Sequence, residues 1–150
     1  MPRLYVENIS AEEMFQAGMS SSSFKTDHLT ILLRFWSMND CLFCKIIAGS
    51  IPGKKVYEDE RVFVFEDLKP QAPTHVLIIP KKHVAGLDQA SEADAGIIGY
   101  CQLVAAKIAR ERGLQNGFRT VYNVGPDAGQ SVFHLHLHLL GGRKMSWPPG

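Results

Sequence analysis

The chain has 150 residues, of which 45% are hydrophobic and 21% are charged, and its formal net charge is +1. This length and composition fit one globular domain with a hydrophobic core. The nearly neutral charge excludes a broad basic surface for nucleic acid or for an anionic membrane. No apolar run approaches the ~20 residues that a membrane-spanning helix needs.

The three cysteines, Cys41, Cys44 and Cys101, are an odd number and include one Cys-x-x-Cys pair. This usage argues against a secreted disulfide framework and indicates a reducing compartment. We therefore expect a cytoplasmic protein. Mitochondria are the alternative if the N-terminal segment is a transit peptide, although transit peptides are poor in acidic residues and this segment carries several.

Residues 1–37 differ from the rest because they contain a serine run and lack a periodic apolar pattern. Ser10 and Glu13 fit a capping box for one short helix. The apolar stretch 29–36 is either a strand that docks on the domain or part of a tail. We predict that residues 1–37 form an extension that is poorly ordered or loosely docked, and that residues 38–150 form the working domain.

A short helix is expected over residues 42–48, closed by Gly49 and the Ile51-Pro52 break. Apolar or alternating runs, each bounded by turn residues, predict strands further along the chain. These strands are expected over residues 61–65, 75–79, 118–124 and 132–140.

A long helix is expected between the second and third of these strands. Ser91 and Asp94 resemble a capping box at its start, and Gly113 supplies a C-cap. Its apolar positions recur at helical spacing, at Ile97, Cys101, Val104 and Ile108. Short connections favour antiparallel strand pairing, so the fold class is α+β with one sheet partly covered by helix.

His134, His136 and His138 alternate with leucines in the last predicted strand. Successive strand side chains point to opposite faces, so we expect the three imidazoles to line one face. Imidazole acts as a nucleophile, a general acid–base or a metal ligand. Zinc chelation by all three rings is a competing interpretation.

The loop 127–131 leads directly into the histidine strand and contains Gly129 and Ser131. Glycine lets a backbone approach an anion closely, and free N–H groups in such a loop can cradle phosphate. Phosphate held there would lie against the imidazoles, which favours attack by imidazole on phosphorus. Backbone amides and imidazolium can neutralise the phosphate charge, so no cofactor is required for catalysis.

The histidine pattern, taken with other motifs, resembles the histidine triad (HIT) family of nucleotidyl hydrolases and transferases. The match includes Asp67–His75, Ile79–His83, Gly129–Val132 and the ending Gly141–Gly150, and these motifs resemble the Hint branch of purine nucleoside phosphoramidases. The resemblance covers Asp40 to the C-terminus. It implies a HIT-like fold, in which about five antiparallel strands accompany one long and one short helix in a homodimer.

The resemblance also implies roles for single residues. His136 is the expected nucleophile, and His138, His75 and Ser131 complete the catalytic group. The substrate-binding positions that it implies are Leu42, Phe43, Phe65, Asp67, Leu68, Asn123, Gly129, Gln130, Ser131, Val132, His136, His138 and Trp147. Apolar side chains would sandwich a purine base, Asp67 would take the ribose hydroxyls, and Trp147 would reach the partner subunit's site.

Cys41 and Cys44 have the spacing of a zinc half-site or of a redox pair. The redox interpretation needs a thioredoxin-like βαβ context, which the sequence lacks. Some HIT proteins carry such a pair, and the resemblance then implies His83 and His134 as the other two ligands of a structural zinc site.

The first interpretation is therefore hydrolysis of adenosine or guanosine 5′-phosphoramidates through a nucleotidyl intermediate on His136. Two alternatives are a diadenosine polyphosphate hydrolase of the Fhit type and a nucleotide-binding regulatory adaptor. The expected partners are a purine nucleotide and a second copy of the chain, with neither nucleic acid nor membrane.

Overall fold

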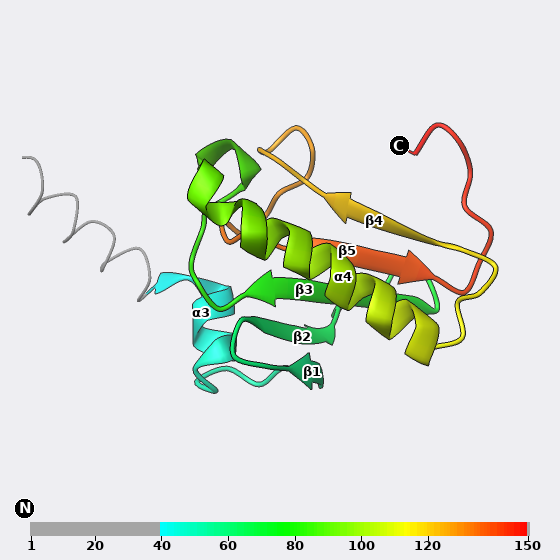
Figure 1. Ribbon diagram of the computed structural model, residues 1–150, viewed down its shortest axis with the longest axis horizontal. Coiled ribbons are helices and arrows are strands. Elements are labelled where there is room, and N and C mark those ends of the chain that lie inside the picture. Colours follow the sequence, from blue (N-terminus) through cyan, green and yellow to red (C-terminus); the bar gives the residue numbers. More distant parts are fainter. Residues whose placement is uncertain (1–39, 150) are drawn as a thin grey trace, which may run out of the picture. The chain divides into compact units, whose positions relative to one another are not determined.

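The computed structural model describes residues 40–149, so the predicted extension 1–37 and its two segments of interest lie outside the described residues. The helices α3 (Leu42–Ile47) and α4 (Ala95–Glu111) accompany two short 3-10 turns, η1 (Leu87–Gln89) and η2 (Glu92–Asp94). The strands are β1 (Lys55–Glu58), β2 (Val62–Glu66), β3 (Thr74–Pro80), β4 (Phe118–Tyr122) and β5 (Leu137–Gly141) (Figure 1). Within residues 40–149 no helix is long and apolar enough to cross a bilayer.

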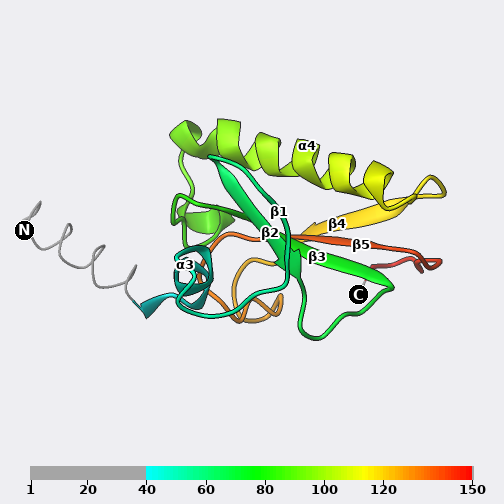
Figure 2. The same cartoon turned by 90° about the horizontal axis from the view of Figure 1, so that it is seen from below.

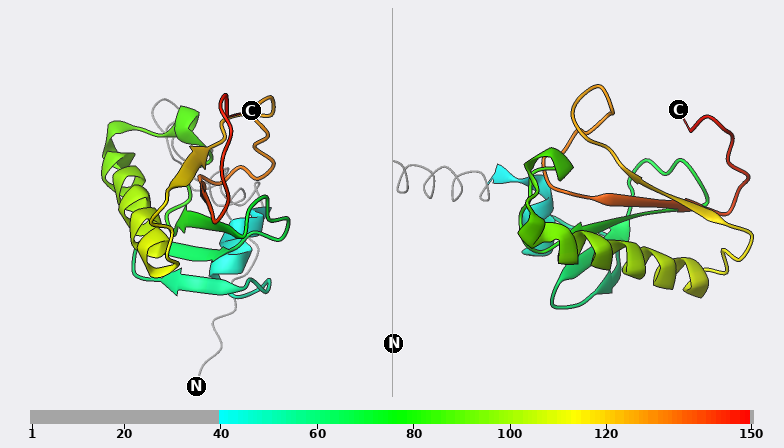
Figure 3. Two further views of the ribbon diagram at one scale, coloured as in Figure 1. Left: turned by 90° about the vertical axis from the view of Figure 1, so that its right-hand side faces the viewer. Right: turned by 45° about the horizontal axis from the view of Figure 1, so that its top comes forward.

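The five strands form one antiparallel sheet in the order β1-β2-β3-β5-β4, which confirms the predicted α+β class. The edge strands β1 and β4 lie at opposite sides of the sheet (Figure 3). The sequence pattern did not predict the strand β1. It has only four residues and is half exposed, so it carries no apolar alternation that marks it as a strand.

The long helix α4 covers one face of the sheet (Figure 2). The predicted capping box is confirmed, because Ser91 and Asp94 bond reciprocally just before the helix. Gly113 follows the helix with a φ of 69°, a conformation that glycine adopts without steric cost. The main core lies between this helix and the sheet, and its buried members include Val62, Val64, Val76, Ile78, Cys101, Val104, Ala105, Ile108, Leu137 and Leu139.

The short helix α3 covers part of the opposite face (Figure 2). Phe43 and Ile46 pack there against alternate residues of the two central strands, namely Phe63, Phe65, Leu77 and Ile79. Both faces of β2 and β3 are therefore buried where α3 and α4 oppose one another, which explains why these strands are apolar at nearly every position. On β5, His138 lies opposite Leu77 in register, so it shares the face that carries α3.

The histidine strand is shorter than predicted, because β5 begins at Leu137 rather than at residue 132. Pairing with β3 stops near Pro80, which has no N–H to donate, and its carbonyl accepts a bond from the His134 ring instead. The alternation nevertheless persists, since Leu135, Leu137 and Leu139 are at most 2% exposed. The leucines thus anchor the segment in the core even where it leaves the sheet.

Candidate active site and metal centre

His75 on β3 and His138 on β5 are joined by a hydrogen bond of 2.9 Å between Nε2 of His75 and Nδ1 of His138. The backbone N–H of Gln71 donates to Nδ1 of His75 over 3.0 Å. A neutral imidazole has one donor nitrogen and one acceptor nitrogen. His75 therefore carries its proton on Nε2 and donates it to His138, whose own proton must lie on Nε2.

The Nε2 atom of His138 is buried and has no hydrogen-bond partner among residues 40–149. A buried donor without a partner costs free energy and commonly marks a functional position. The three groups Gln71 N–H, His75 and His138 thus form a relay that ends in a free donor at His138 Nε2.

His136 has the complementary arrangement. Its Nδ1 lies 2.6 Å from the carbonyl oxygen of His134, and a carbonyl only accepts, so Nδ1 carries the proton. The lone pair is therefore on Nε2. The ring of Phe43 packs edge-on against the His136 imidazole with centroids 5.2 Å apart, and the His138 ring lies 5.0 Å away. The site consequently sets the His136 ring, with a lone pair on Nε2, beside the ring of His138, whose Nε2 is a hydrogen-bond donor.

Burial keeps these rings neutral. Burial lowers the pKa of His138 from its ordinary 6.5 to about 4, and the neighbouring His136 and His75 add to the effect. Burial also lowers the pKa of His136 and of His75, against the opposing influence of Asp67. All three imidazoles are therefore uncharged at neutral pH, which is the state that the hydrogen-bond pattern requires.

Asp67 lies beside the relay, with its carboxylate 3.4 Å from Nε2 of His75. These two residues and His138 form a cluster whose ligand atoms converge as in a metal site. The hydrogen bond from Gln71 argues against that use, because it occupies Nδ1 of His75 and a metal at Nε2 would require an imidazolate. The arrangement fits a hydrogen-bond relay rather than a metal centre.

The predicted nucleoside pocket contains both buried and exposed members. Phe43 and Phe65 are buried and contact each other edge-on, with ring centroids 5.5 Å apart. Leu42 and Leu68 are exposed, the latter at 91%. The two phenylalanines are therefore core residues that can offer only a ring edge, whereas the two leucines have free surface.

The predicted phosphate loop is held in place by Gln130. Its side-chain oxygen accepts from the Gly125 N–H, and its amide nitrogen donates to the carbonyls of Ala85 and Val132. The Gln130 side chain is therefore engaged within the protein and shapes the loop. Gly129, at a φ of 82°, and Ser131 are exposed at its end.

Three further predicted positions are Asn123, Val132 and Trp147. Asn123 and Val132 are half-buried, and Val132 packs on the apolar cluster around α3. Trp147 lies in the C-terminal tail and is 85% exposed. Its predicted contact with a partner subunit stays a prediction.

Cys41, Cys44, His83 and His134 come together at the start of α3, and their ligand atoms lie within 4.8 Å of one another. The three cysteine–histidine distances are 3.3 to 3.5 Å, measured from Sγ of Cys41 or Cys44 to Nδ1 of His83 or His134. A tetrahedral zinc ion with ordinary ligand distances places sulfur and nitrogen about 3.5 Å apart. The spacing thus fits a Cys₂His₂ site.

The surroundings of His134 favour metal ligation as well. Nε2 of His134 donates to the Pro80 carbonyl over 2.8 Å, which leaves the lone pair on Nδ1, the atom that faces the two sulfurs. Burial, together with the neighbouring Cys41, raises the pKa of the Cys44 thiol to about 12. A bound cation would stabilise the thiolates that burial disfavours.

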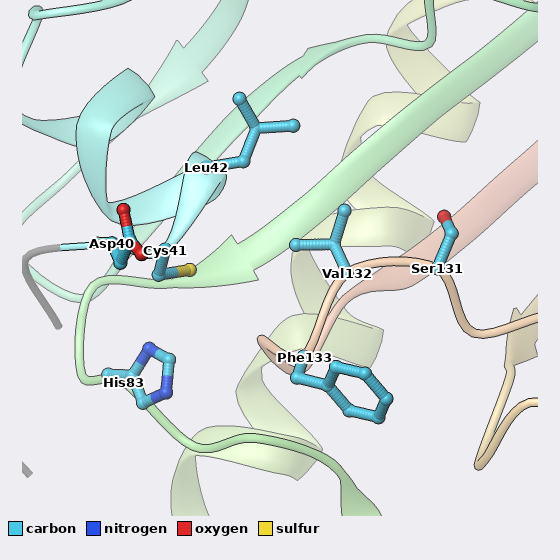
Figure 4. Close-up of a pocket in the computed structure, with 7 residues that line it drawn as sticks. All are labelled: Asp40, Cys41, Leu42, His83, Ser131, Val132 and Phe133. Carbon is cyan, nitrogen blue, oxygen red and sulfur yellow. The ribbon is translucent and has the colours of Figure 1, made fainter. Parts of the chain in front are cut away.

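A cavity of about 450 Å³ lies between the metal cluster and the loop before His134 (Figure 4). Cys41 and His83 stand on one side, and the loop that carries Val132 stands on the other. Its lining residues are Asp40, Cys41, Leu42, His83, Ser131, Val132 and Phe133. The cavity therefore touches both the metal cluster and the beginning of the predicted phosphate site.

The sequence interpretation missed the main-chain groups of this site. The Gln71 N–H and the carbonyls of His134 and Pro80 decide which imidazole nitrogens carry protons. No side-chain pattern marks such groups. Arg143, which bonds the Gln71 carbonyl, was visible only as part of the C-terminal motif.

The fold and site define an α+β protein whose candidate active site consists of hydrogen-bonded histidines at one end of an antiparallel sheet. The HIT domain family matches residues 48–145. A maize protein named 14 kDa zinc-binding protein is 53% identical over 111 residues, which are 73% of this chain and 87% of the maize protein. An uncharacterized HIT-like protein of Synechococcus elongatus is 49% identical over 111 residues, or 74% and 97% of the two chains.

Solved structures agree with the sequence comparison. The crystal structure of a HIT family hydrolase from Legionella pneumophila is similar with a TM-score of 0.73 at 50% identity, over 74% of this chain and 100% of that one. The chain therefore belongs to the HIT domain family.

Proposed function

We propose that the protein hydrolyses purine nucleoside 5′-phosphoramidates to the nucleoside monophosphate and an amine. The observation that carries this proposal is the lone pair on Nε2 of His136, fixed by the bond from Nδ1 to the His134 carbonyl. A nucleophile with a fixed tautomer beside a free donor at His138 suits attack on phosphorus. The similar Legionella protein is a hydrolase by its description, which supports this class of reaction.

The reaction has two steps. Nε2 of His136 forms a bond to the α-phosphorus while the P–N bond breaks. The leaving nitrogen takes a proton from the Ser131 hydroxyl, which takes one from solvent in turn, while His138 Nε2–H donates a hydrogen bond to a phosphoryl oxygen. Water then attacks phosphorus, breaks the bond to His136 and releases its proton to solvent. Dividing the reaction in this way replaces one difficult step by two easier ones.

The purine and ribose specificity rests on the resemblance to the Hint branch. Asp67 lies at the start of the loop after β2, close to the histidine relay, where a ribose hydroxyl can reach its carboxylate. Leu42 and Leu68 offer exposed apolar surface for a base. We assign the ribose to the side of Asp67 and the leaving amine to the side of Ser131, where Leu42 lines the same cavity.

We also propose that Cys41, Cys44, His83 and His134 hold a structural zinc ion. The donor set and its spacing fit that ion, and the similar maize protein is described as zinc-binding. A bound zinc would cross-link the start of α3 to the segment that carries His136. Four protein ligands leave no position for substrate, so the reaction itself uses only the chain's own residues.

A homodimer in the cytoplasm is the proposed form of the protein. The C-terminal tail bears the exposed Trp147, and Arg119 fixes the tail through a bond of 2.7 Å to the Ser146 carbonyl. In the homodimer the tail would reach the partner subunit's site.

The test compares turnover of adenosine 5′-phosphoramidate, guanosine 5′-phosphoramidate and diadenosine triphosphate by the full chain, with His136→Asn as the control. We expect the phosphoramidates to be cleaved faster than the dinucleotide. Faster cleavage of diadenosine triphosphate would instead support the Fhit-type alternative. Absence of turnover on all three, with retained nucleotide binding, would support the adaptor.

A further inference from the structure

The backbone of Gln71 is held at both ends. Its N–H donates to Nδ1 of His75 over 3.0 Å, and its carbonyl accepts from Nε of Arg143 over 3.0 Å. Arg143 follows β5 and is 72 residues away in sequence. The loop after β2 and the tail after β5 meet at the same end of the sheet, where Thr74 pairs with Gly141 (Figure 1).

The Gln71 N–H favours one tautomer in two rings at once, and the Asp67 carboxylate, 3.4 Å from Nε2 of His75, favours the same one. While it donates to His75, the proton of His75 lies on Nε2 and that of His138 also lies on Nε2. If the N–H moved away, both rings could exchange tautomers, with Nδ1 of His138 donating to His75. His138 Nε2 would then become an acceptor and would repel a phosphoryl oxygen.

Among residues 40–149, Arg143 is, besides His75 itself, the side chain from outside the β2–β3 connection that hydrogen-bonds this loop. In the same residues, the Gln71 side chain bonds the nearby Lys69 carbonyl, which does not tie the loop to the sheet. Arg143 also donates to the Lys144 carbonyl over 3.1 Å, so its guanidinium is held at two points. Gly142, at a φ of 84°, allows the tail to pass close to Pro73, where an added Cβ would lie 3.0 Å from the proline Cβ.

We propose that Arg143 is a positioning residue that acts through the Gln71 peptide to keep His75 and His138 in the tautomers that direct a donor into the active site. The consequence for turnover rests on the proposed phosphoramidase function, whereas the consequence for the tautomers rests on the hydrogen bonds alone. Arg143 itself does not touch the reacting atoms.

The experiment combines nitrogen NMR of the imidazole rings with steady-state kinetics on the full-length Arg143→Ala, Arg143→Lys and Arg61→Ala variants. Arg61 is the matched control, because it also donates to a backbone carbonyl, that of Gly96, but from the opposite end of β2. In Arg143→Ala we expect mixed tautomers at His75 and His138, and a kcat on adenosine 5′-phosphoramidate that is lower by about five- to tenfold with little change in KM. Arg143→Lys should retain most of the wild-type tautomer population and most of the wild-type kcat. Arg61→Ala should leave the tautomers unchanged.

A single unchanged tautomer in Arg143→Ala would overturn the proposal, as would a loss of kcat with unchanged tautomers. If the wild-type protein fails to cleave phosphoramidates, the proposed function fails. In that case the imidazole spectra still decide whether Arg143 acts on His75.

Discussion

At the residue scale, main-chain hydrogen bonds determine the chemistry of the histidines. The His134 carbonyl holds the proton of His136 on Nδ1, and the Gln71 N–H holds that of His75 on Nε2. The neighbouring rings of His136 and His138 thereby receive opposite roles, because Nε2 of His136 carries a lone pair and Nε2 of His138 carries a proton. Backbone geometry thus differentiates side chains of the same chemical type.

His136→Asn should lower turnover of a purine phosphoramidate by at least about a thousandfold, because the side-chain amide has no lone pair suited to attack phosphorus. Binding of the nucleoside monophosphate, measured by calorimetry, should change little. Turnover near that of the wild type, or nucleotide trapped covalently on another residue, would contradict the assignment.

His138 should make stability depend on pH. Its pKa is about 4 in the folded protein and 6.5 in an unfolded chain, so the unfolded state binds more protons between these values. The contribution of His138 to the free energy of unfolding should therefore be complete above pH 6.5. It should decline as the pH falls toward 4, by up to about 1.4 kcal/mol per pH unit. Urea denaturation at several pH values checks this, and His138→Asn should show a shallower dependence. Equal slopes in the two proteins would refute it.

The residue types at the site could be predicted from the sequence, but the tautomers could not. The alternation around His136 and the pair of cysteines are visible as patterns. The partners that determine which nitrogen of each imidazole carries the proton are backbone atoms of residues far apart in the chain, such as Pro80 and Gln71. Only the folded arrangement brings these atoms within hydrogen-bond distance.

At the scale of elements, α3 links the metal cluster to the apolar packing beneath the active site. Cys41 and Cys44 lie at its start, and Phe43 between them packs against His136. One turn of helix thus supplies two candidate ligands and one wall of the site. Disturbance of the cluster would therefore reach His136 both through Phe43 and through the His134 carbonyl, which accepts from Nδ1 of His136.

Cys44→Ser should abolish binding of one zinc per chain and lower the thermal unfolding midpoint by more than about 5 °C. Cys101→Ser is the control for metal binding, because Cys101 lies on the buried face of α4 and outside the cluster. Elemental analysis and calorimetry give the two readouts. In the wild type, chelation should lower stability while turnover at low temperature persists. Chelation that stops turnover, with metal retained in Cys44→Ser, would instead favour a metal held by the histidine triad.

The elements that could be predicted from the sequence are those in which the apolar pattern repeats over many residues. The stripe through Cys101 and Ile108 predicts α4, and its capping box is found where Ser91 places it. The short edge strand β1 has no such period. The early end of pairing in β5 depends on Pro80, which lies in a different strand and is invisible in the histidine pattern.

At the scale of the whole molecule, every recognised motif lies within residues 40–150. Removing residues 1–37 should therefore leave the melting temperature within about 2 °C and kcat/KM within about twofold of the full chain, because their sequence lacks a periodic apolar pattern that would form part of a core. Differential scanning calorimetry and the phosphoramidate assay measure both quantities. A large loss of thermal stability would show that residues 29–36 pack on the domain.

A second prediction at this scale concerns assembly. Leu103 on α4 is 68% exposed, and β4 is an edge strand beside that helix, so this side offers apolar surface and unpaired backbone groups to a second copy. Light scattering at micromolar concentration should give twice the 16.7 kDa of one chain. Leu103→Asp should reduce the mass to one chain, whereas Gln102→Glu at the neighbouring exposed position should not. A wild-type mass of one chain would contradict the homodimer.

The alternation of leucine and histidine along residues 134–140 has a consequence for how this protein can change over evolution. Leu137 and Leu139 set the register of β5 against β3, and the same register fixes which way His138 faces. A shift of one residue would bury imidazoles in the core and turn the leucines outward. An insertion in this segment would therefore disturb both the packing of the leucines and the direction of the histidines. A single change of length between residues 134 and 140 would thus alter the fold and the candidate site together.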